Sequence, residues 1–442
     1  MFVRHLGLAN FRNYVRLDLA LAPGLSVLWG DNGQGKTNLL EALYLLATSR
    51  SHRTSAEREL VNWHAGTTPV FARAAADVER HPSPVRLEVV LVEAAGASTG
   101  AGGPAAAPVA STVPGPAAGL AAGPGDEAAG APANGSESGR AGRAPAAAVR
   151  RRVRINGHHR RPSDLLGHLN VVLFSPEDVN LVAGPAEVRR RYLNVALCQI
   201  DQHYLRALQR YLRVLQQRNA LLREVRERPA NAGSFEYWDS QLVELGAALM
   251  AGWLRAITWL NEHLAEVHPR LTRDPAGLRA AYRPNVPLGA DVDELGRAAA
   301  ADGEAAVVEL LRARFEAHLA TVRARERHQG VTLAGPHRDD AAFMVGPVDL
   351  RVYGSRGQQR AAALGVKLAE AALMERYTAE RPVLLLDDVM SELDSQRRDL
   401  LEAIVLDQQQ VLLTASDPGV LSAGFLGRAD RYRVEAGSVL KS

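Results

Sequence analysis

Near the start of the 442-residue chain, glycines, a lysine and a threonine are spaced as Gly-x-x-x-x-Gly-Lys-Thr, ending at Lys36 and Thr37. Glycines allow turns that a Cβ would block, so backbone N–H groups can point inward around an anion. A lysine at this place can reach terminal phosphates, and the threonine hydroxyl can hold Mg²⁺. We predict a P-loop formed by Gly30, Asp31, Asn32, Gly33, Gln34, Gly35, Lys36 and Thr37.

A second reactive group, Asp387 and Asp388, follows the apolar run 383–386, about 350 residues after the lysine. Two carboxylates at the end of a buried strand can form the metal- and water-positioning half of a nucleotide site. Asp387 would hold Mg²⁺, and Asp388 would orient the attacking water or accept its proton. We therefore predict catalytic roles for Lys36, Asp387 and Asp388, with Thr37 and Asp387 at the metal.

Lysine is rare in this chain: only Lys36, Lys367 and Lys441 occur among 52 basic residues. The other 49 are arginines. An ammonium on a flexible stem differs from a guanidinium in shape and hydration. A lysine retained in the glycine-rich loop is consistent with a phosphate-binding role.

The elements around this loop fit a strand–loop–helix unit. Residues 25–29 read as a buried strand, and apolar residues at helical spacing follow the loop. Alternating apolar residues over 2–21 predict a hairpin leading into this strand. Strand-like segments at 70–78 and 85–92 are expected to continue the same sheet.

Residues 94–148 are almost entirely Ala, Gly, Pro and Ser. Such a segment buries too little apolar surface to offset its ordering entropy, so we expect a disordered insertion in a surface loop. The strands on either side should pair without it. An Asn-Gly turn at 156–157 and an apolar strand at 169–174 follow.

The middle of the chain is predicted to be helical over 186–228, 235–268 and 304–328. These lengths indicate a compact lobe or short arm. The fold class expected is α/β, with an inserted, mainly helical lobe. The predicted domains are 1–185, 186–330 and 331–442.

A helix opening at Ser355 precedes the two carboxylates. Ser355 could cap this helix, and Gly357 permits close approach. The strand 410–415 then carries Thr414 at its polar end.

This order of motifs resembles the ATPase heads of the ABC/SMC superfamily. The resemblance implies an ABC/SMC-like P-loop ATPase head with a mixed sheet and flanking helices, into which the helical lobe is inserted. The resemblance implies that Ser355, Gly357 and Gln358 bind the γ-phosphate of ATP on a second copy of the chain. It implies a D-loop at 391–394 and a switch position at Thr414, where the usual histidine is missing. No glutamine ends the strand 169–174, which leaves Ser175 or Glu177 for the Q-loop role.

Within the superfamily the chain is similar to the RecF family of bacterial recombinational repair ATPases. The similar segments are Phe174-Ser-Pro-Glu-Asp, Arg189-Arg-Arg-Tyr-Leu, Gly335-Pro-His-Arg-Asp-Asp, Ser355-Arg-Gly-Gln-Gln-Arg and Leu385-Leu-Asp-Asp-Val-Met-Ser-Glu-Leu-Asp. The resemblance implies a weak, DNA-stimulated ATPase acting as a switch. It implies ATP-dependent dimerisation on duplex or gapped DNA, with RecO and RecR as partners and RecA reached through them.

The net charge is only +3, but arginines cluster, which is typical of a polyanion partner. The candidate DNA contacts are Arg12, Arg50, Arg53, Arg151 and Arg189. No run approaches a membrane span, no secretory signal is present, and Cys198 is the only cysteine, so we expect a cytoplasmic protein.

Three other functions are less well supported by the sequence. An SMC-like DNA-tethering ATPase would need long heptad arms or a Cys-x-x-Cys hook, which the sequence lacks. The ATPase subunit of a non-DNA ABC assembly, such as a transporter, would need a membrane partner. A nuclease would need a further acidic metal cluster, and we interpret His337, Asp339 and Asp340 as a structural loop.

Overall fold

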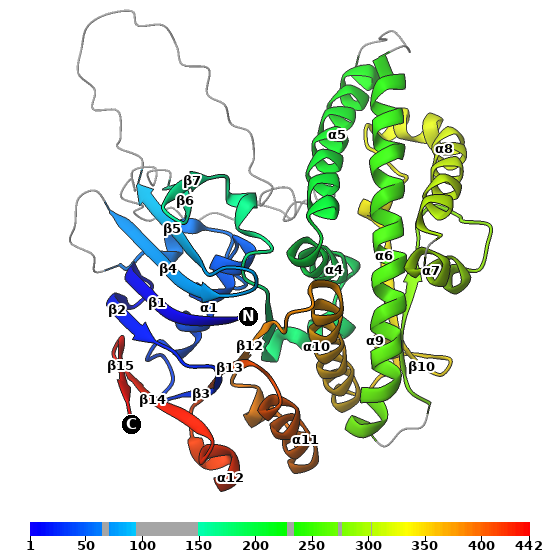
Figure 1. Ribbon diagram of the computed structural model, residues 1–442. Helices are drawn as coiled ribbons and strands as arrows, with labels where there is room; N and C mark the ends of the chain where they lie inside the picture. The colour runs from blue at the N-terminus through cyan, green and yellow to red at the C-terminus, as the bar shows by residue number, and fades with distance from the viewer. Residues whose placement is uncertain (64–69, 94–148, 228–233, 273–275, 302) are drawn as a thin grey trace, which may run out of the picture.

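The computed structural model describes residues 1–63, 70–93, 149–227, 234–272, 276–301 and 303–442. The predicted insertion at 94–148 lies outside these residues. The described chain forms a two-sheet head and a helical lobe at its side (Figure 1).

One sheet is antiparallel and six-stranded, in the order β2-β1-β4-β5-β6-β7. Its strands alternate apolar residues toward the core with polar residues outward, as expected of a sheet solvated on one face. They are β1 (Phe2–Phe11), β2 (Tyr14–Ala20), β4 (Phe71–Glu79), β5 (Val85–Glu93), β6 (Val149–Ile155) and β7 (His158–Arg160).

The second sheet also has six strands, in the order β15-β14-β3-β13-β12-β8, and only β15 runs antiparallel to its neighbour. Its central strands are almost wholly apolar because both faces are covered. They are β3 (Gly24–Trp29), β8 (Val171–Phe174), β12 (Val383–Asp387), β13 (Gln410–Ala415), β14 (Ala429–Glu435) and β15 (Ser438–Lys441).

Helix α1 (Lys36–Thr48) packs between the two sheets, where Leu39 and Leu40 are fully buried in a core shared with both. The prediction of one continuous sheet was therefore wrong. The hairpin β1–β2 and strands β4–β5 belong to the antiparallel sheet, whereas β3 joins the parallel one. The alternation of apolar and polar residues along a strand predicts which side chains face a core. It does not predict which sheet the strand joins.

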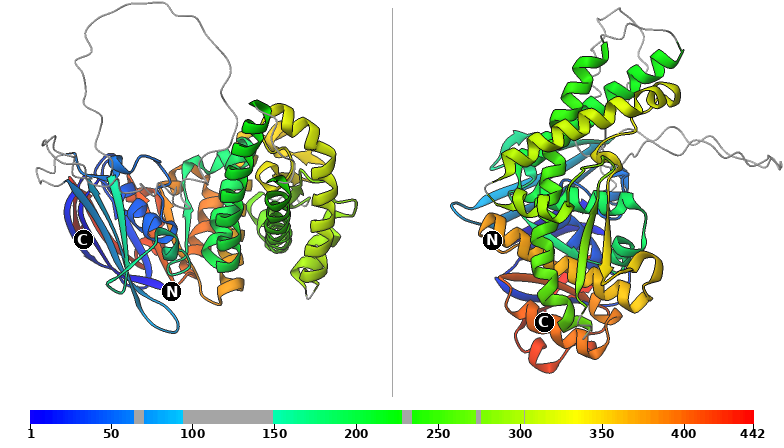
Figure 2. Two further views of the ribbon diagram at one scale, coloured as in Figure 1. Left: turned by 90° about the horizontal axis from the view of Figure 1, so that it is seen from above. Right: turned by 90° about the vertical axis from the view of Figure 1, so that its right-hand side faces the viewer.

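The lobe contains α4 (Ala186–Ile200), α5 (Gln202–Glu227), α6 (Ser234–Thr272), α7 (Val292–Ala300) and α8 (Glu304–Gln329). Helices α5, α6 and α8 project together from the head, which confirms a compact lobe (Figures 1 and 2). The single helix predicted over 186–228 is in fact two. Asp201 ends the first, and its Oδ1 accepts hydrogen bonds from the backbone N–H groups of His203 (2.8 Å) and Tyr204 (2.9 Å).

A three-stranded sheet completes the lobe, in the order β11 (Val348–Asp349), β10 (Asp340–Val345) and β9 (Leu278–Arg283). Helix α10 (Arg356–Thr378) packs on α6 and joins the lobe to the head. The shorter helices are α3 (Val179–Ala183), α9 (Leu350–Tyr353), α11 (Ser395–Leu406) and α12 (Ala423–Leu426).

By length and composition alone, α6 could cross a membrane, which was not anticipated from the sequence. However, 78% of its most apolar window is buried within the fold, against α5, α7, α8 and α10. Its apolar residues are therefore accounted for by the core of the lobe.

The two residues that flank the insertion pair directly across the antiparallel sheet, since Glu93 on β5 lies opposite Val149 on β6. Replacing residues 94–148 with a two-residue Asn-Gly turn should therefore preserve the fold. Closing a shorter loop costs less chain entropy, so the free energy of unfolding should rise by roughly 2–3 kcal/mol. Thermal and denaturant unfolding test this. A variant with lower stability than the full chain would contradict it.

Candidate nucleotide-binding site

The predicted loop joins the end of β3 to the start of α1. Gly30 and Gly35 have φ values of 149° and 118°, which L-residues rarely adopt. A Cβ on Gly30 would lie 2.3 Å from the carbonyl oxygen of Val434, and one on Gly35 would lie 2.6 Å from Asn13 Nδ2. Only glycine fits at these two positions, so the loop keeps its backbone open at the start of the helix, as a phosphate cradle requires.

Lys36 lies in this loop with its side chain folded back over it. Its Nζ donates hydrogen bonds to the carbonyl oxygens of Gly30 (2.6 Å) and Asp31 (2.9 Å). Burial lowers the pKa of Lys36, and the carboxylates of Asp388 and Asp387 act in the opposite sense. A cation held between a Gly-rich loop and two carboxylates can neutralise a phosphate group.

The two halves of the predicted site meet at Thr37 and Asp387. Thr37 Oγ1 donates to Asp387 Oδ1 at 2.8 Å, although 350 residues separate them. Thr414 Oγ1 donates to the same oxygen at 2.9 Å and accepts from the N–H of Asp388 at 2.9 Å. Burial raises the pKa of Asp387, and the two threonine hydrogen bonds offset part of this rise.

This donor set fits a Mg²⁺ ion, which prefers carboxylate, hydroxyl and phosphate oxygens. Thr37 and Asp387 supply two such oxygens at the mouth of the glycine-rich loop. The loop itself fits a polyphosphate, because Gly30, Gly33 and Gly35 adopt positive φ values just before helix α1 and the Lys36 ammonium lies over the loop. The residues present therefore suit both ATP and its metal.

The loop is held by residues that were not assigned a role from sequence. Asn13 Nδ2 donates to the carbonyl oxygen of Gln34 (2.7 Å), and Tyr14 OH donates to that of Gly35 (3.1 Å). Gln34 Oε1 accepts from the N–H of Ala436 (2.7 Å). The sequence placed these residues within the hairpin predicted over 2–21, and nothing in it connected them with a loop about twenty residues away.

The predicted signature residues begin α10 as expected. Ser355 Oγ accepts from the N–H of Gln358 at 3.2 Å, and Gln358 Oε1 accepts from the N–H of Ser355 at 2.9 Å, which forms a reciprocal cap. Ser355, Gly357 and Gln358 are all exposed. Among the described residues, no hydrogen bond links them to the P-loop of the same chain, so they face outward.

The remaining predicted motifs surround Asp387. Ser391 Oγ donates to the carbonyl oxygen of Asp388 (2.7 Å), and Glu392 pairs with Arg360 of α10 (2.7 Å). Glu177 is one of the charges that raise the pKa of Asp387. Of the two Q-loop candidates, Glu177 is thus the one that acts electrostatically on the site.

Most of the arginines predicted to contact DNA are engaged within the fold. Arg12 pairs with buried Glu41 through two hydrogen bonds of 2.8 and 2.7 Å. Arg151 pairs with Glu57 (2.6 Å). Arg189 is 2% exposed and pairs with Asp340 at 2.7 Å, and Arg50 is 8% exposed.

These contacts argue against Arg12, Arg50, Arg151 and Arg189 as direct phosphate contacts in this conformation. Arg53 alone of the five candidates has a substantially exposed side chain, at 47%. It donates to Asn38 Oδ1 at 2.9 Å, beside the P-loop helix. A basic run in the sequence does not show which arginines face an internal carboxylate.

A family model for the AAA domain matches residues 5–79, which include the P-loop. A curated protein from Chloroflexus aurantiacus, described as "DNA replication and repair protein RecF", is 43% identical over 99% of both chains. Proteins with the same description from Chloroflexus aggregans and Roseiflexus castenholzii are 41% and 40% identical, each over 99% of both chains.

Two solved structures share the fold over the whole chain. One is described as the recombination mediator protein RecF-ATPrS in the RecFOR pathway, with a TM-score of 0.73 and 26% identity, covering 100% of this chain and 98% of that one. The other, described as RecF-ATP in the same pathway, has a TM-score of 0.74 and 25% identity, covering 100% and 97%.

Proposed function

The chain belongs to the RecF family of DNA replication and repair proteins, within the ABC/SMC-like ATPases, and we propose that it is an ATP-dependent DNA-binding protein of recombinational repair. The observation that carries the proposal is the hydrogen bond between Thr37 and Asp387. It joins the two halves of a nucleotide site across 350 residues.

Each residue of the site has a distinct proposed task. Lys36 and the N–H groups of the glycine-rich loop bind the phosphates, while Thr37 and Asp387 hold Mg²⁺. The metal, when bound, neutralises developing charge on the phosphates. Asp388 lies next to this pair at the end of β12 and orients the water that attacks the γ-phosphate.

The exposed start of α10 supports a site completed by a second copy of the chain. Ser355, Gly357 and Gln358 face solvent with a preformed cap, and the N–H groups of a helix start favour an anion. In a symmetric dimer this surface would meet ATP bound to the partner's P-loop. ATP would thus drive dimerisation on duplex or gapped DNA, and slow hydrolysis would release it.

The cellular role proposed is help in loading recombinase at replication gaps. RecO and RecR would be the direct partners and RecA an indirect one, in the cytoplasm. The naming of the RecFOR pathway for two structural relatives supports this role.

Sedimentation of the purified protein with no nucleotide, with ATP and with ADP tests the proposal. ATP alone should convert monomer to dimer, and Ser355→Arg should block this while ATP still binds. Each condition should be repeated with a gapped duplex. A mass that never changes although ATP binds would rule out ATP-driven dimerisation.

A further inference from the structure

The outer face of the antiparallel sheet carries charges that the nucleotide site does not use. The strand register places Arg16 of β2, Arg73 of β4 and Arg152 of β6 in one cross-strand row, separated by Ala9 of β1 and Val90 of β5. With strands about 4.8 Å apart, the row spans roughly 19 Å. Arg150 lies on the same face of β6, two residues before Arg152.

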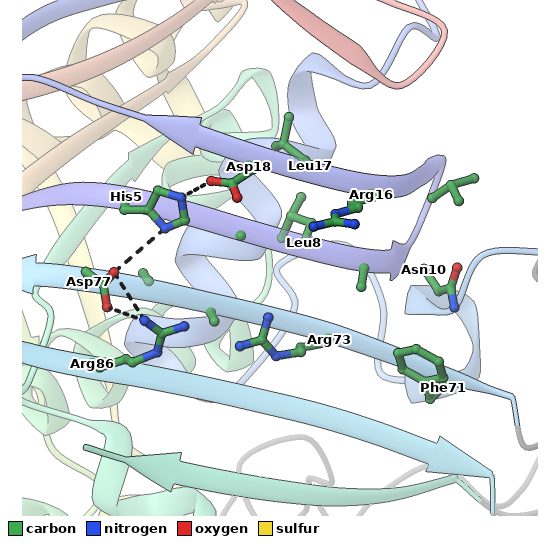
Figure 3. Close-up of a pocket in the computed structure, with 15 residues that line it drawn as sticks. His5, Leu8, Asn10, Arg16, Leu17, Asp18, Phe71, Arg73, Asp77 and Arg86 are labelled. Carbon is green, nitrogen blue, oxygen red and sulfur yellow. Dashed lines mark hydrogen bonds and ion pairs between the residues drawn. The ribbon is translucent and has the colours of Figure 1, made fainter. Parts of the chain in front are cut away.

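The side chains between these arginines are small. Gly7, Ala9 and Ala75 line a hollow of about 410 Å³ together with Arg16 and Arg73 (Figure 3). Small side chains here leave the longer arginines standing above the sheet on either side of β1. A bulky ligand can therefore lie across the strands and be contacted from both sides.

Opposite charges on this face are separated along the strands. Asp18 and Asp77 gather around His5 at one end, and Asp77 also pairs with Arg86 (3.3 Å). The other end, with Arg16 and Arg73, carries no acidic side chain in the hollow (Figure 3). Because of this separation, the half of the face that contains Arg16 and Arg73 is basic, and its charges are not evenly mixed with acidic ones.

No salt bridge among the described residues neutralises three arginines of that half, although the charge of Arg16 acts on Asp18, two residues along β2. Arg16, Arg150 and Arg152 are exposed, and no ion pair joins them to any residue within the described ranges. Arg73 and Arg154 share Glu88, so two guanidinium groups face one carboxylate. We call Arg16, Arg73, Arg150 and Arg152 the basic face.

We infer that the basic face binds the phosphate backbone of duplex DNA, separately from the nucleotide site. Duplex DNA carries one charge per about 1.7 Å of helix axis when both strands are counted, so a length of roughly 19 Å carries about eleven phosphates. Guanidinium groups match phosphate oxygens in planar, two-point contacts. The inference rests on the proposed function, because it assigns to this surface the DNA that the function requires. It replaces the buried arginines predicted from sequence.

The test is the salt dependence of duplex binding by the full chain with ATP, comparing wild type with Arg16→Gln/Arg152→Gln. Each lost phosphate contact should reduce the slope of log K against log salt by about 0.9, so two should reduce it by about 1.8. The same relation gives a loss of about 60-fold in affinity at 0.1 M salt. Binding of a single-stranded oligonucleotide of equal length is measured in the same way, for comparison with the duplex.

The matched control is Arg325→Gln/Arg428→Gln, which removes the same charge from exposed positions on α8 and beyond α12. It should bind DNA as the wild type does. The inference would be overturned by an unchanged salt slope in Arg16→Gln/Arg152→Gln, or by an equal loss of DNA affinity in the control. An acidic protein would then be the better candidate for binding this face.

Failure here is distinguishable from failure of the proposed function. Arg16 and Arg152 lie on the outer face of the antiparallel sheet, and within the described ranges no side-chain hydrogen bond or ion pair joins them to the P-loop or α10. ATP-driven dimerisation of the variant should therefore match the wild type. If dimerisation is normal but the DNA slope is unchanged, only the basic face is wrong. If the wild type binds DNA through this face without ever dimerising, only the proposed ATP-driven dimerisation is wrong.

Discussion

Lys36→Met is expected to weaken ATP binding by about 30- to 4,000-fold. Removing one partner of a buried, hydrogen-bonded charge pair costs about 2–5 kcal/mol, and each 1.4 kcal/mol is tenfold. Methionine keeps an unbranched side chain of similar length, so the loop loses a charge with little loss of volume. Equilibrium binding of a fluorescent ATP analogue, followed by calorimetry with ATP, measures the effect.

Lys441→Met is the matched control because it removes the same group from an exposed position. Lys441 has a 64% exposed side chain and pairs with Asp430 at 2.8 Å, on the edge strand β15. It should bind ATP as the wild type does. ATP affinity within threefold of wild type in Lys36→Met would contradict the assignment of Lys36 to the phosphates.

Gly357→Arg is expected to weaken ATP-dependent dimerisation strongly while leaving each monomer able to bind ATP. A Cβ on Gly357 meets no atom within 4 Å, so the single chain accommodates the new side chain. Arginine also favours a helix more than glycine does. In the dimer the side chain would enter a closed interface twice, and overpacking costs about 1–3 kcal/mol at each site. Dimerisation should weaken by about 30- to 20,000-fold.

This variant is cleaner than Ser355→Arg, because losing the Ser355 cap costs about 0.5–2 kcal/mol of stability on its own. Gly424→Arg is the matched control. Gly424 lies on α12 and is exposed, and a Cβ added to it would likewise meet no atom within 4 Å. Analytical ultracentrifugation with ATP compares the two. Normal dimerisation of Gly357→Arg would exclude α10 from the interface.

Local pattern was enough to predict most elements and the local geometry around the glycine-rich loop. Residues close together in sequence form the P-loop, the Ser355 cap and the strand before Asp387. Their spacing is therefore enough to predict the local geometry. The capping role of Asp201 was missed because the apolar stripe runs through it without interruption. Here a side-chain cap overrode the periodicity.

Pairings between residues far apart in the sequence could not be predicted in the same way. Arg189 and Asp340 are 151 residues apart, and their pairing becomes visible only when α4 meets β10. The same holds for the anchoring of Gln34 by Ala436. Burying a charge requires a specific partner, and a sequence names the charges without naming the pairs.

The position of β3 between β13 and β14 has a consequence for synthesis on the ribosome. Roughly 380 residues separate Trp29 from Gln410, and at about 5–20 residues per second they take about 20–80 s to translate. Throughout that interval the P-loop strand has neither of its neighbours, and its apolar residues are available to chaperones. A nascent chain cannot bring Asp387 and Thr414 to Thr37 until β12 and β13 have emerged, so the ATP-driven pairing proposed above would be confined to nearly finished chains.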